Sequence, residues 1–242
     1  MLIVKAYKYR LKTNRDIEHK LNSYAGTNRW VWNKMLAINL ERLERKDKVM
    51  YYEEMHYWSK MWKDSEEYGF LKEVHSQTIQ QKLKDLSKAF KDCFDKKQPN
   101  KRLPRFKKKG LGDSFRYPQG VKVEGNIVYL PKIGAVRFRK SRDISGIIKN
   151  STLSRKGRHW YISLQVEYDI SSVSHPNPGK ELGLDMGIKS LITTSEGDHI
   201  LGANIYRRLE QKLCKEQQKL SRKKKGSNNS KKQRFKLSWV HE

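Results

Sequence analysis

A single acidic residue interrupts an apolar segment late in the chain. Asp185 is the only charged residue of LGLDMGI, residues 182–188. A carboxylate in a buried strand costs several kcal/mol unless it is paired or holds a metal ion. One interpretation is a ligand of Mg²⁺ in phosphoryl transfer, where two ions about 4 Å apart activate water and stabilise the leaving oxygen. The other is a structural aspartate that caps the turn at Gly187. A single acid does not decide between these two interpretations, because several acids must converge to hold two Mg²⁺ ions.

A basic segment is the second place where residue types indicate chemistry. Residues 98–120 read QPNKRLPRFKKKGLGDSFRYPQG, and their prolines and glycines interrupt any helix. Cations can hold phosphates while an aromatic ring stacks on a base. The alternative is a solvated linker, but the PRF core favours binding. The candidate binding residues of this segment are Arg102, Arg105, Phe106, Lys107, Lys108, Lys109, Arg116 and Tyr117.

Further cations alternate with apolar residues or form short clusters. In a strand pattern one face packs, and the other is available to phosphate groups. The candidates of this kind are Arg10 and Lys12 near the N-terminus, Arg29 in the first expected helix, Arg137 and Arg139 in an expected strand, Arg155 at an expected hairpin tip, and Arg222, Lys223 and Lys224 near the C-terminus.

The overall charge agrees with a polyanionic partner. The 242 residues include 53 Lys and Arg against 26 Asp and Glu, a formal net charge of +27. Such a field attracts nucleic acid or an anionic membrane surface. No apolar run approaches the roughly 18 residues of a membrane-spanning helix, and the N-terminus lacks the pattern of a secretory signal. We therefore expect a cytoplasmic, nucleoid-associated protein without a membrane partner. Cys93 and Cys214 are isolated and predict neither a disulfide nor a zinc site.

The N-terminus predicts a strand followed by a helical bundle. Residues 4–12, VKAYKYRLK, alternate with the period of a half-buried strand, and Thr13 or Asn14 then caps a helix. Two more helices follow, because apolar residues recur at helical spacing. The second stripe is Met55, Trp58, Met61 and Trp62, and the third is Ile79, Leu83, Leu86, Phe90 and Phe94. Residues 14–97 thus predict a small bundle, in which tryptophans are core residues more often than base-stacking ones.

Strands return from residue 126. Pro131 and Gly134 separate two short strands, and residues 152–170 predict a hairpin with its turn near Lys156 and Gly157. The side chains of this hairpin expected to be buried are Trp160, Ile162, Leu164, Val166 and Tyr168. A polar linker, 171–180, leads to a meander of short strands with a tight turn at Glu196 and Gly197. The predicted fold class is α+β.

The order of these segments resembles TnpB, the OrfB-type RNA-guided nuclease of small insertion sequences, which is related to type V CRISPR effectors. The matching segments are KAYKYRLKTN, NRWVWNKML, HSQTIQQKLKDLSKAFKDCF, PRFKKKG, SFRYPQG, LPKIG, WYISLQVE, GLDMGIKSLITTSEG and QQKLSRKKKGSNNSKKQ. Because so many blocks occur in one order along the whole chain, the resemblance is specific.

The resemblance implies that different parts of the chain have different roles. Residues 1–13 and 98–170 resemble the wedge, a β-barrel that binds the guide RNA scaffold. Residues 14–97 resemble a helical recognition domain inserted into the wedge. After the linker 171–180, residues 181–242 resemble the N-terminal part of a RuvC nuclease, which has an RNase H-like fold. The implied partners are guide RNA and target DNA, and a second copy of the chain is a further candidate.

Asp185 matches the family's first catalytic acid and hence a ligand of Mg²⁺. LSWVHE, residues 237–242, resembles a region that precedes the family's other two catalytic acids and its zinc-binding cysteines. We therefore expect a C-terminally truncated protein that binds nucleic acid without cleaving it on its own. The alternatives are a nuclease-dead, RNA-guided DNA-binding regulator, an inert remnant of a mobile element, and a generic RNA-binding protein.

Overall fold

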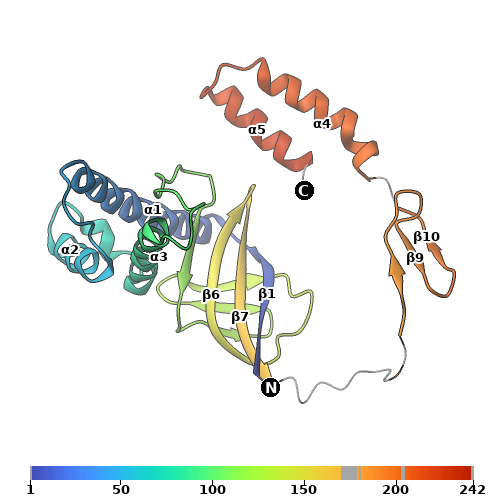
Figure 1. The fold of residues 1–242 in the computed structure, drawn as a ribbon, viewed down its shortest axis with the longest axis horizontal. Coiled ribbons are helices and arrows are strands. Elements are labelled where there is room, and N and C mark those ends of the chain that lie inside the picture. The colour runs from blue at the N-terminus through green and yellow to red at the C-terminus, as the bar shows by residue number, and fades with distance from the viewer. Residues whose placement is uncertain (1, 170–178, 180, 203–204, 241–242) are drawn as a thin grey trace. The chain divides into compact units, whose positions relative to one another are not determined.

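The computed structural model describes residues 2–169, 179, 181–202 and 205–240. Contacts divide the chain into two units, residues 1–170 and residues 171–242, and each is described by itself (Figure 1). Apart from Gly179, the predicted linker 171–180 lies outside the described residues.

The first unit contains a seven-stranded antiparallel sheet with the order β2-β6-β7-β1-β5-β4-β3. Along the described chain, hydrogen-bonded pairing leaves β2 and β3 at the two edges, so the sheet is open. The strands are β1 (Leu2–Lys12), β2 (Ser114–Tyr117), β3 (Lys122–Glu124), β4 (Ile127–Leu130), β5 (Gly134–Phe138), β6 (Ile147–Lys156) and β7 (His159–Asp169).

Strand β1 joins the two halves of this sheet. Residues 2–10 pair with β7, whereas Leu11 and Lys12 pair with β5. The predicted alternation is confirmed, since Tyr7, Tyr9 and Leu11 are all buried. A strand with this period buries one face and leaves its polar residues on the other.

The hairpin of β6 and β7 also forms as predicted. Its turn contains Gly157, whose φ of +57° lies in the left-handed region that glycine adopts without steric cost. The residues Trp160, Ile162, Leu164 and Val166 are buried, and Tyr168 is half-buried.

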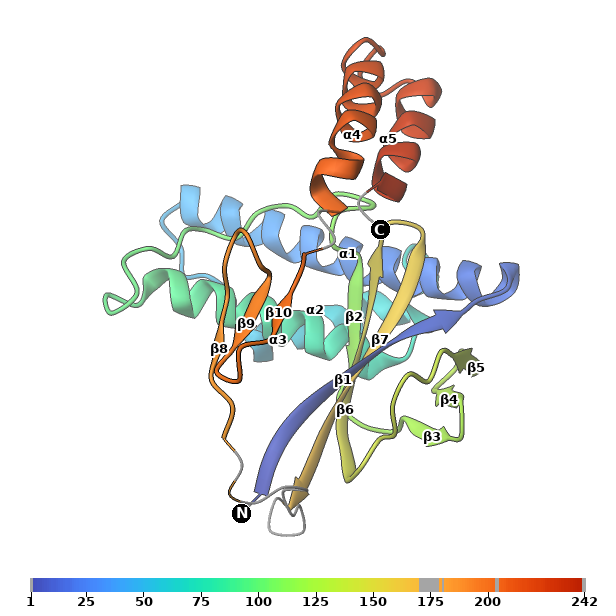
Figure 2. The same ribbon diagram turned by 90° about the vertical axis from the view of Figure 1, so that its right-hand side faces the viewer.

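Three helices and a short 3-10 helix follow β1: α1 (Arg15–Glu44), α2 (Tyr52–Asp64), η1 (Gly69–Lys72) and α3 (Ser76–Phe94). Helix α1 begins after Asn14, whose side-chain oxygen accepts a hydrogen bond from the Ile17 amide at 2.8 Å. Figure 2 shows α1 and α3 side by side across the sheet. The predicted stripe of α3 is buried from Ile79 to Phe90, and only Phe94 is exposed, at 49%.

The stripe predicted for α2 is only partly buried. Met55 is fully buried, whereas Trp58 and Met61 are 43% and 51% exposed. Core burial of Trp58 was therefore a wrong expectation. Helix α2 packs against η1 and α3, and this contact covers Met55 and Ser59 but not the whole apolar stripe.

The helices and the sheet of this unit share one core. The ring of Tyr24 on α1 lies 5.2 Å from Phe115 and 6.3 Å from Tyr117, both on β2. The Tyr24 hydroxyl donates to the Pro131 carbonyl at 3.3 Å. These contacts fix β2 against α1. The boundaries between a wedge and a helical domain stay a prediction.

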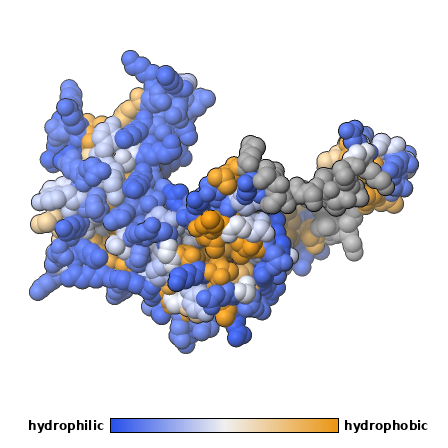
Figure 3. Space-filling view, turned by 90° about the horizontal axis from the view of Figure 1, so that it is seen from below, coloured by the Kyte–Doolittle hydropathy of each residue, from blue (hydrophilic) through white to orange (hydrophobic). Residues whose placement is uncertain are grey.

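Part of the sheet carries exposed apolar side chains. Figure 3 shows apolar atoms gathered on the face seen from below. Near the starts of β1 and β6, Leu2, Val4 and Ile147 are more than half exposed. No helix in the described part of the chain is both long enough and apolar enough to cross a membrane.

The second unit contains a three-stranded antiparallel meander and two helices. Its elements are β8 (Leu184–Asp185), β9 (Ile192–Thr194), β10 (His199–Ile200), α4 (Ile205–Ser221) and α5 (Asn228–Val240). The predicted turn at Gly197 is confirmed, with the Gly197 amide donating to the Thr194 carbonyl at 3.0 Å. The Gln233 side chain joins α5 to α4 by donating to a Glu216 carboxylate oxygen at 2.6 Å.

Candidate nucleic-acid interface

The centre of the basic segment is anchored to α1 through its backbone. The indole nitrogen of Trp32 donates to the Arg105 carbonyl at 3.0 Å. The Asn33 amide donates to the Lys107 carbonyl at 3.0 Å and accepts from the Lys107 amide at 2.8 Å. Three hydrogen bonds from neighbouring residues of one helix therefore fix residues 105–107, which we call the anchored segment.

The anchored segment presents one aromatic ring and one cation to solvent. Phe106 is 52% exposed, and Arg105 beside it is exposed as well. Lys107 turns the other way, with its Nζ 4.1 Å from the centre of the Trp32 ring, and burial lowers the pKa of Lys107. The predicted neighbours Arg102, Lys108 and Lys109 are exposed. An exposed ring between cations is suited to stacking on a base while phosphates are neutralised.

Asp113 fixes the turn that follows the anchored segment. One of its carboxylate oxygens accepts from the Gly110 amide at 3.0 Å, and the other lies 2.9 Å from Arg29 Nη1. Arg29 therefore positions this loop. The sequence pattern did not indicate this role for Arg29. Arg155 is likewise engaged with α1, since its Nη1 donates to the Asn22 side chain at 2.9 Å and its Nη2 lies 3.7 Å from Glu18.

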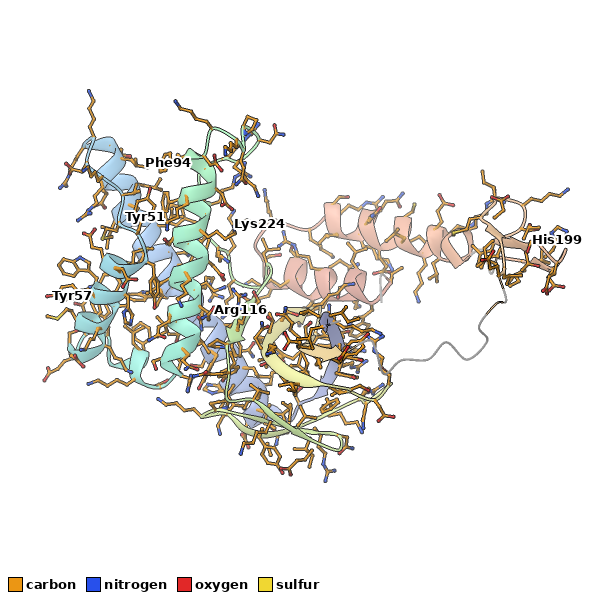
Figure 4. All side chains as sticks on the ribbon, turned by 60° about the horizontal axis from the view of Figure 1, so that its bottom comes forward. Tyr51, Tyr57, Phe94, Arg116, His199 and Lys224 are labelled. Atoms are coloured by element: carbon orange, nitrogen blue, oxygen red, sulfur yellow. The ribbon has the colours of Figure 1, made fainter. Side chains whose placement is uncertain are left out.

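A cluster of charges lies where α3 meets β2. Arg116 forms an ion pair with Asp85 at 2.6 Å, and Figure 4 shows Arg116 at this junction. Lys82 lies 3.6 Å from the same carboxylate, and its side chain is only 7% exposed. Burial is the main cause that lowers the pKa of Lys82 to about 8, and the nearby charge of Lys107 adds to it. Asp85 opposes this shift.

Four predicted cations come together where β1 meets β5. Lys12 is the register partner of Arg137, and the Arg139 amide donates to the Arg10 carbonyl at 2.8 Å. Lys12, Arg137 and Arg139 are exposed, and Arg10 is half-buried. Since the neighbouring Phe138 is buried, the alternation predicted for this strand is confirmed. The result is a compact cationic area on the sheet.

The prediction that Tyr117 contacts nucleic acid is wrong. Tyr117 is fully buried, and its hydroxyl donates to the Pro131 carbonyl at 3.0 Å. Desolvation raises the pKa of this hydroxyl far above its usual value. The physical reason is that β2 pairs with β6 and packs under Tyr24 of α1, so that Phe115 and Tyr117 face the core.

The expectation that Asp185 lies in a buried central strand is also wrong. Asp185 is exposed and belongs to β8, an edge strand of the meander. Leu184 and Met186 beside it are 61% and 77% exposed, because no described element covers this face. An exposed carboxylate carries little desolvation cost, so Asp185 needs no partner for stability. Among the described residues, no three His, Cys, Asp or Glu side chains are grouped as a metal site.

The remaining predicted cations belong to the second unit. Arg222, Lys223 and Lys224 are exposed between α4 and α5, and Figure 4 marks Lys224.

Sequence patterns missed the residues that anchor the basic segment. Trp32 and Asn33 fall in a helix whose tryptophans were expected to pack. Asparagine is unfavourable in a helix interior because its side chain competes for backbone hydrogen bonds. Helix α1 contains four asparagines, Asn22, Asn28, Asn33 and Asn39, and they were therefore a usable signal.

Sequence comparisons give the relationship of this chain to known proteins. Residues 162–242 match a family described as probable transposase, OrfB_IS605, and residues 1–48 match the related helix-turn-helix domain. Over 240 residues the chain is 40% identical to InsQ of Escherichia coli (strain K12), whose name describes an RNA-guided DNA endonuclease. The chain is a TnpB-type protein. Within residues 2–44, however, the structure has a strand and one long helix rather than a helix-turn-helix.

A second relative, from Streptomyces pristinaespiralis, is named in the same terms and is 30% identical over 243 residues. The alignments cover 98% and 99% of this chain but 59% and 60% of the two relatives, so the chain spans about three fifths of their length. One solved structure is a complex of Cas12f1 with guide RNA and target DNA. Its alignment covers 99% of this chain and 76% of the Cas12f1 chain, at 11% sequence identity and a TM-score of 0.41.

Proposed function

We propose that this TnpB-type chain binds a guide RNA and, through it, a target DNA. The names of the two relatives support this, since both describe RNA-guided DNA endonucleases. The observation that carries the proposal is the anchored segment, where Trp32 and Asn33 hold the backbone while Arg105 and Phe106 stay exposed. A solvated linker needs no such anchoring.

The proposed roles follow the parts of the chain. Residues 1–13 and 98–170 act as the wedge that holds the RNA scaffold, and residues 14–97 act as the recognition part. The cationic area of Lys12, Arg137 and Arg139 supports the first role. Residues 181–242 form the N-terminal part of a RuvC-like nuclease.

Asp185 is the proposed equivalent of the first catalytic acid. Mg²⁺ takes near-octahedral oxygen coordination, and the described residues do not fit this need around Asp185, because they provide no group of three potential ligands. The function proposed for the described residues is therefore nucleic-acid binding.

The test is the salt dependence of RNA binding. If several phosphates are neutralised, the affinity should fall by orders of magnitude between about 50 and about 200 mM salt, with a logarithmic slope of about −0.7 per contact for single strands. The variant Lys108→Gln with Lys109→Gln removes two exposed charges beside the anchored segment. Its slope should be shallower by about 1.4.

The matched control is Lys46→Gln with Lys48→Gln, which removes two exposed charges after α1. This control should keep the slope of the unmodified protein. A flat salt response of the unmodified chain, or equal slopes for the two double variants, overturns the proposal for the basic segment. A generic RNA-binding protein would bind structured RNAs of unrelated sequence with equal affinity.

A further inference from the structure

An open groove runs along α1, beside the basic segment. It encloses about 650 Å³ and lies between one side of α1 and Phe70 of η1. Its lining from α1 includes Gly26, Arg29, Trp30 and Lys34. The described residues that line it include no acid.

Aromatic side chains form a rigid wall of this groove. The rings of Trp30 and Phe70 lie 5.1 Å apart and almost perpendicular, at 89°. Trp30 is held from behind by Tyr68 at 5.1 Å and Trp62 at 5.7 Å. Both groove-lining rings remain partly exposed. Such a preformed wall stacks on a flat ligand without losing much conformational freedom.

Gly26 leaves this groove open. Glycine within a helix is less favourable than alanine, and here the packing of the unit does not demand it. A Cβ atom at this position would meet only Arg29 Nη2, at 3.8 Å. The missing side chain therefore gives space to something outside the helix rather than to a neighbouring element.

Hydrogen bonds connect the lining of the groove to the basic segment. Arg29 lines the groove while its Nη1 bonds Asp113, which fixes the turn after the anchored segment. Asn33 also lines the groove and bonds the backbone of Lys107. Lys34 is exposed at the rim. Two residues of α1 that line the groove, Arg29 and Asn33, are thus also bonded to the basic segment.

We propose that this groove holds one unpaired base of the bound RNA, with the base against Trp30 and Phe70 and its phosphate near Arg29 and Lys34. The proposal rests on the proposed function, because it assigns a second base-binding position to the same RNA. Charge complementarity identifies the occupant: a chain of net charge +27 with an acid-free groove suits a polyanion that carries aromatic rings.

The experiment compares two fluorescent single-stranded RNAs of about 15 nucleotides, the length that one single-strand site covers. The first has all its bases, and the second has the same backbone with abasic positions. Gly26→Leu fills the groove, and it should weaken binding of the complete RNA by about tenfold while leaving binding of the abasic RNA unchanged. Phe70→Leu, which keeps an apolar side chain but removes the ring, should give the same pattern.

The matched control is His19→Leu, which places the same side chain on the exposed side of α1, about 10 Å along the helix and outside the groove. It should bind both RNAs like the unmodified protein, and thermal melting verifies the fold of each variant. If the unmodified chain binds neither RNA, the proposed function itself fails. If it binds and folded Gly26→Leu and Phe70→Leu lose nothing, or lose both RNAs equally, the groove proposal is overturned.

Discussion

The side chain of Asn33 makes two hydrogen bonds to the backbone of Lys107, as a neighbouring β-strand would. It donates to the Lys107 carbonyl at 3.0 Å and accepts from the Lys107 amide at 2.8 Å. Replacing Asn33 with Leu removes both hydrogen bonds. We expect the free energy of unfolding to fall by about 1–3 kcal/mol, and RNA binding to weaken because the anchored segment loses its geometry. Urea denaturation and RNA titration measure the two effects.

Asn33→Asp is the matched control, since it keeps the acceptor for the Lys107 amide and loses only the donor. Its loss of stability should lie between those of the unmodified protein and the leucine variant. Equal stability of all three proteins would show that the anchoring bonds contribute nothing.

Phe106→Ala should weaken binding of single-stranded RNA by about 1–3 kcal/mol without changing the melting temperature. The ring is 52% exposed, so its removal opens no cavity, but it removes a stacking surface. Leu111→Ala is the control, because Leu111 is 70% exposed in the same loop and cannot stack as an aromatic ring does. A lower melting temperature with unchanged binding would instead identify Phe106 as a packing residue.

Lys82 should make the stability of the protein rise with pH. Burial lowers its pKa to about 8 from the usual 10.5, so the folded state releases this proton before the unfolded state does. Between these two values the unfolded state binds more protons, and the free energy of unfolding therefore increases as the pH rises. Below about pH 8 the charged form is present in both states and its burial cost is felt in full.

The measurement is urea denaturation at about pH 7.5 and about pH 9.5. The unmodified protein should gain ~1–2 kcal/mol more than Lys82→Met over this interval. Lys88→Met is the control, because that side chain is 76% exposed. The same pH response in the unmodified protein and in Lys82→Met would exclude Lys82 as the source.

Tyr117→Phe should reduce stability and leave RNA binding unchanged. The variant loses the hydrogen bond to the Pro131 carbonyl, which still accepts from Tyr24, so the loss should be about 0.5–1.5 kcal/mol. Thermal melting and RNA titration test this on one preparation. Weaker RNA binding by a stably folded variant would show that Tyr117 does contribute to RNA binding.

Local patterns predicted most of the secondary structure in the first unit. The alternation in β1, the Asn14 cap and the apolar stripe of α3 are each set by residues near in sequence, and each is present. Local patterns do not reveal which side of a helix or strand is covered by another element. Trp58 has the spacing of a core residue but lies on the uncovered side of α2.

The same limit explains the errors in the candidate site. Phe106 and Tyr117 both lie among cations in one segment, and the sequence pattern therefore predicted nucleic-acid binding for both. Phe106 follows a backbone held by α1, whereas Tyr117 lies in a strand that pairs with β6 and packs beneath Tyr24. Asp185 was assigned to a buried strand from its apolar neighbours, but burial depends on elements that cover the meander, and the described residues provide none.

The pairing of β1 sets the timing of folding during synthesis. Its partners, β5 and β7, end at residues 138 and 169, so β1 leaves the ribosome long before either exists. At about 5–20 residues per second, β1 waits roughly 10–30 s for β7. Helices α1 to α3 depend on nearer contacts and can form meanwhile. The nascent chain therefore carries an unpaired strand with Leu2 and Val4 for that interval, which makes its N-terminus a natural target for chaperones that bind emerging polypeptides.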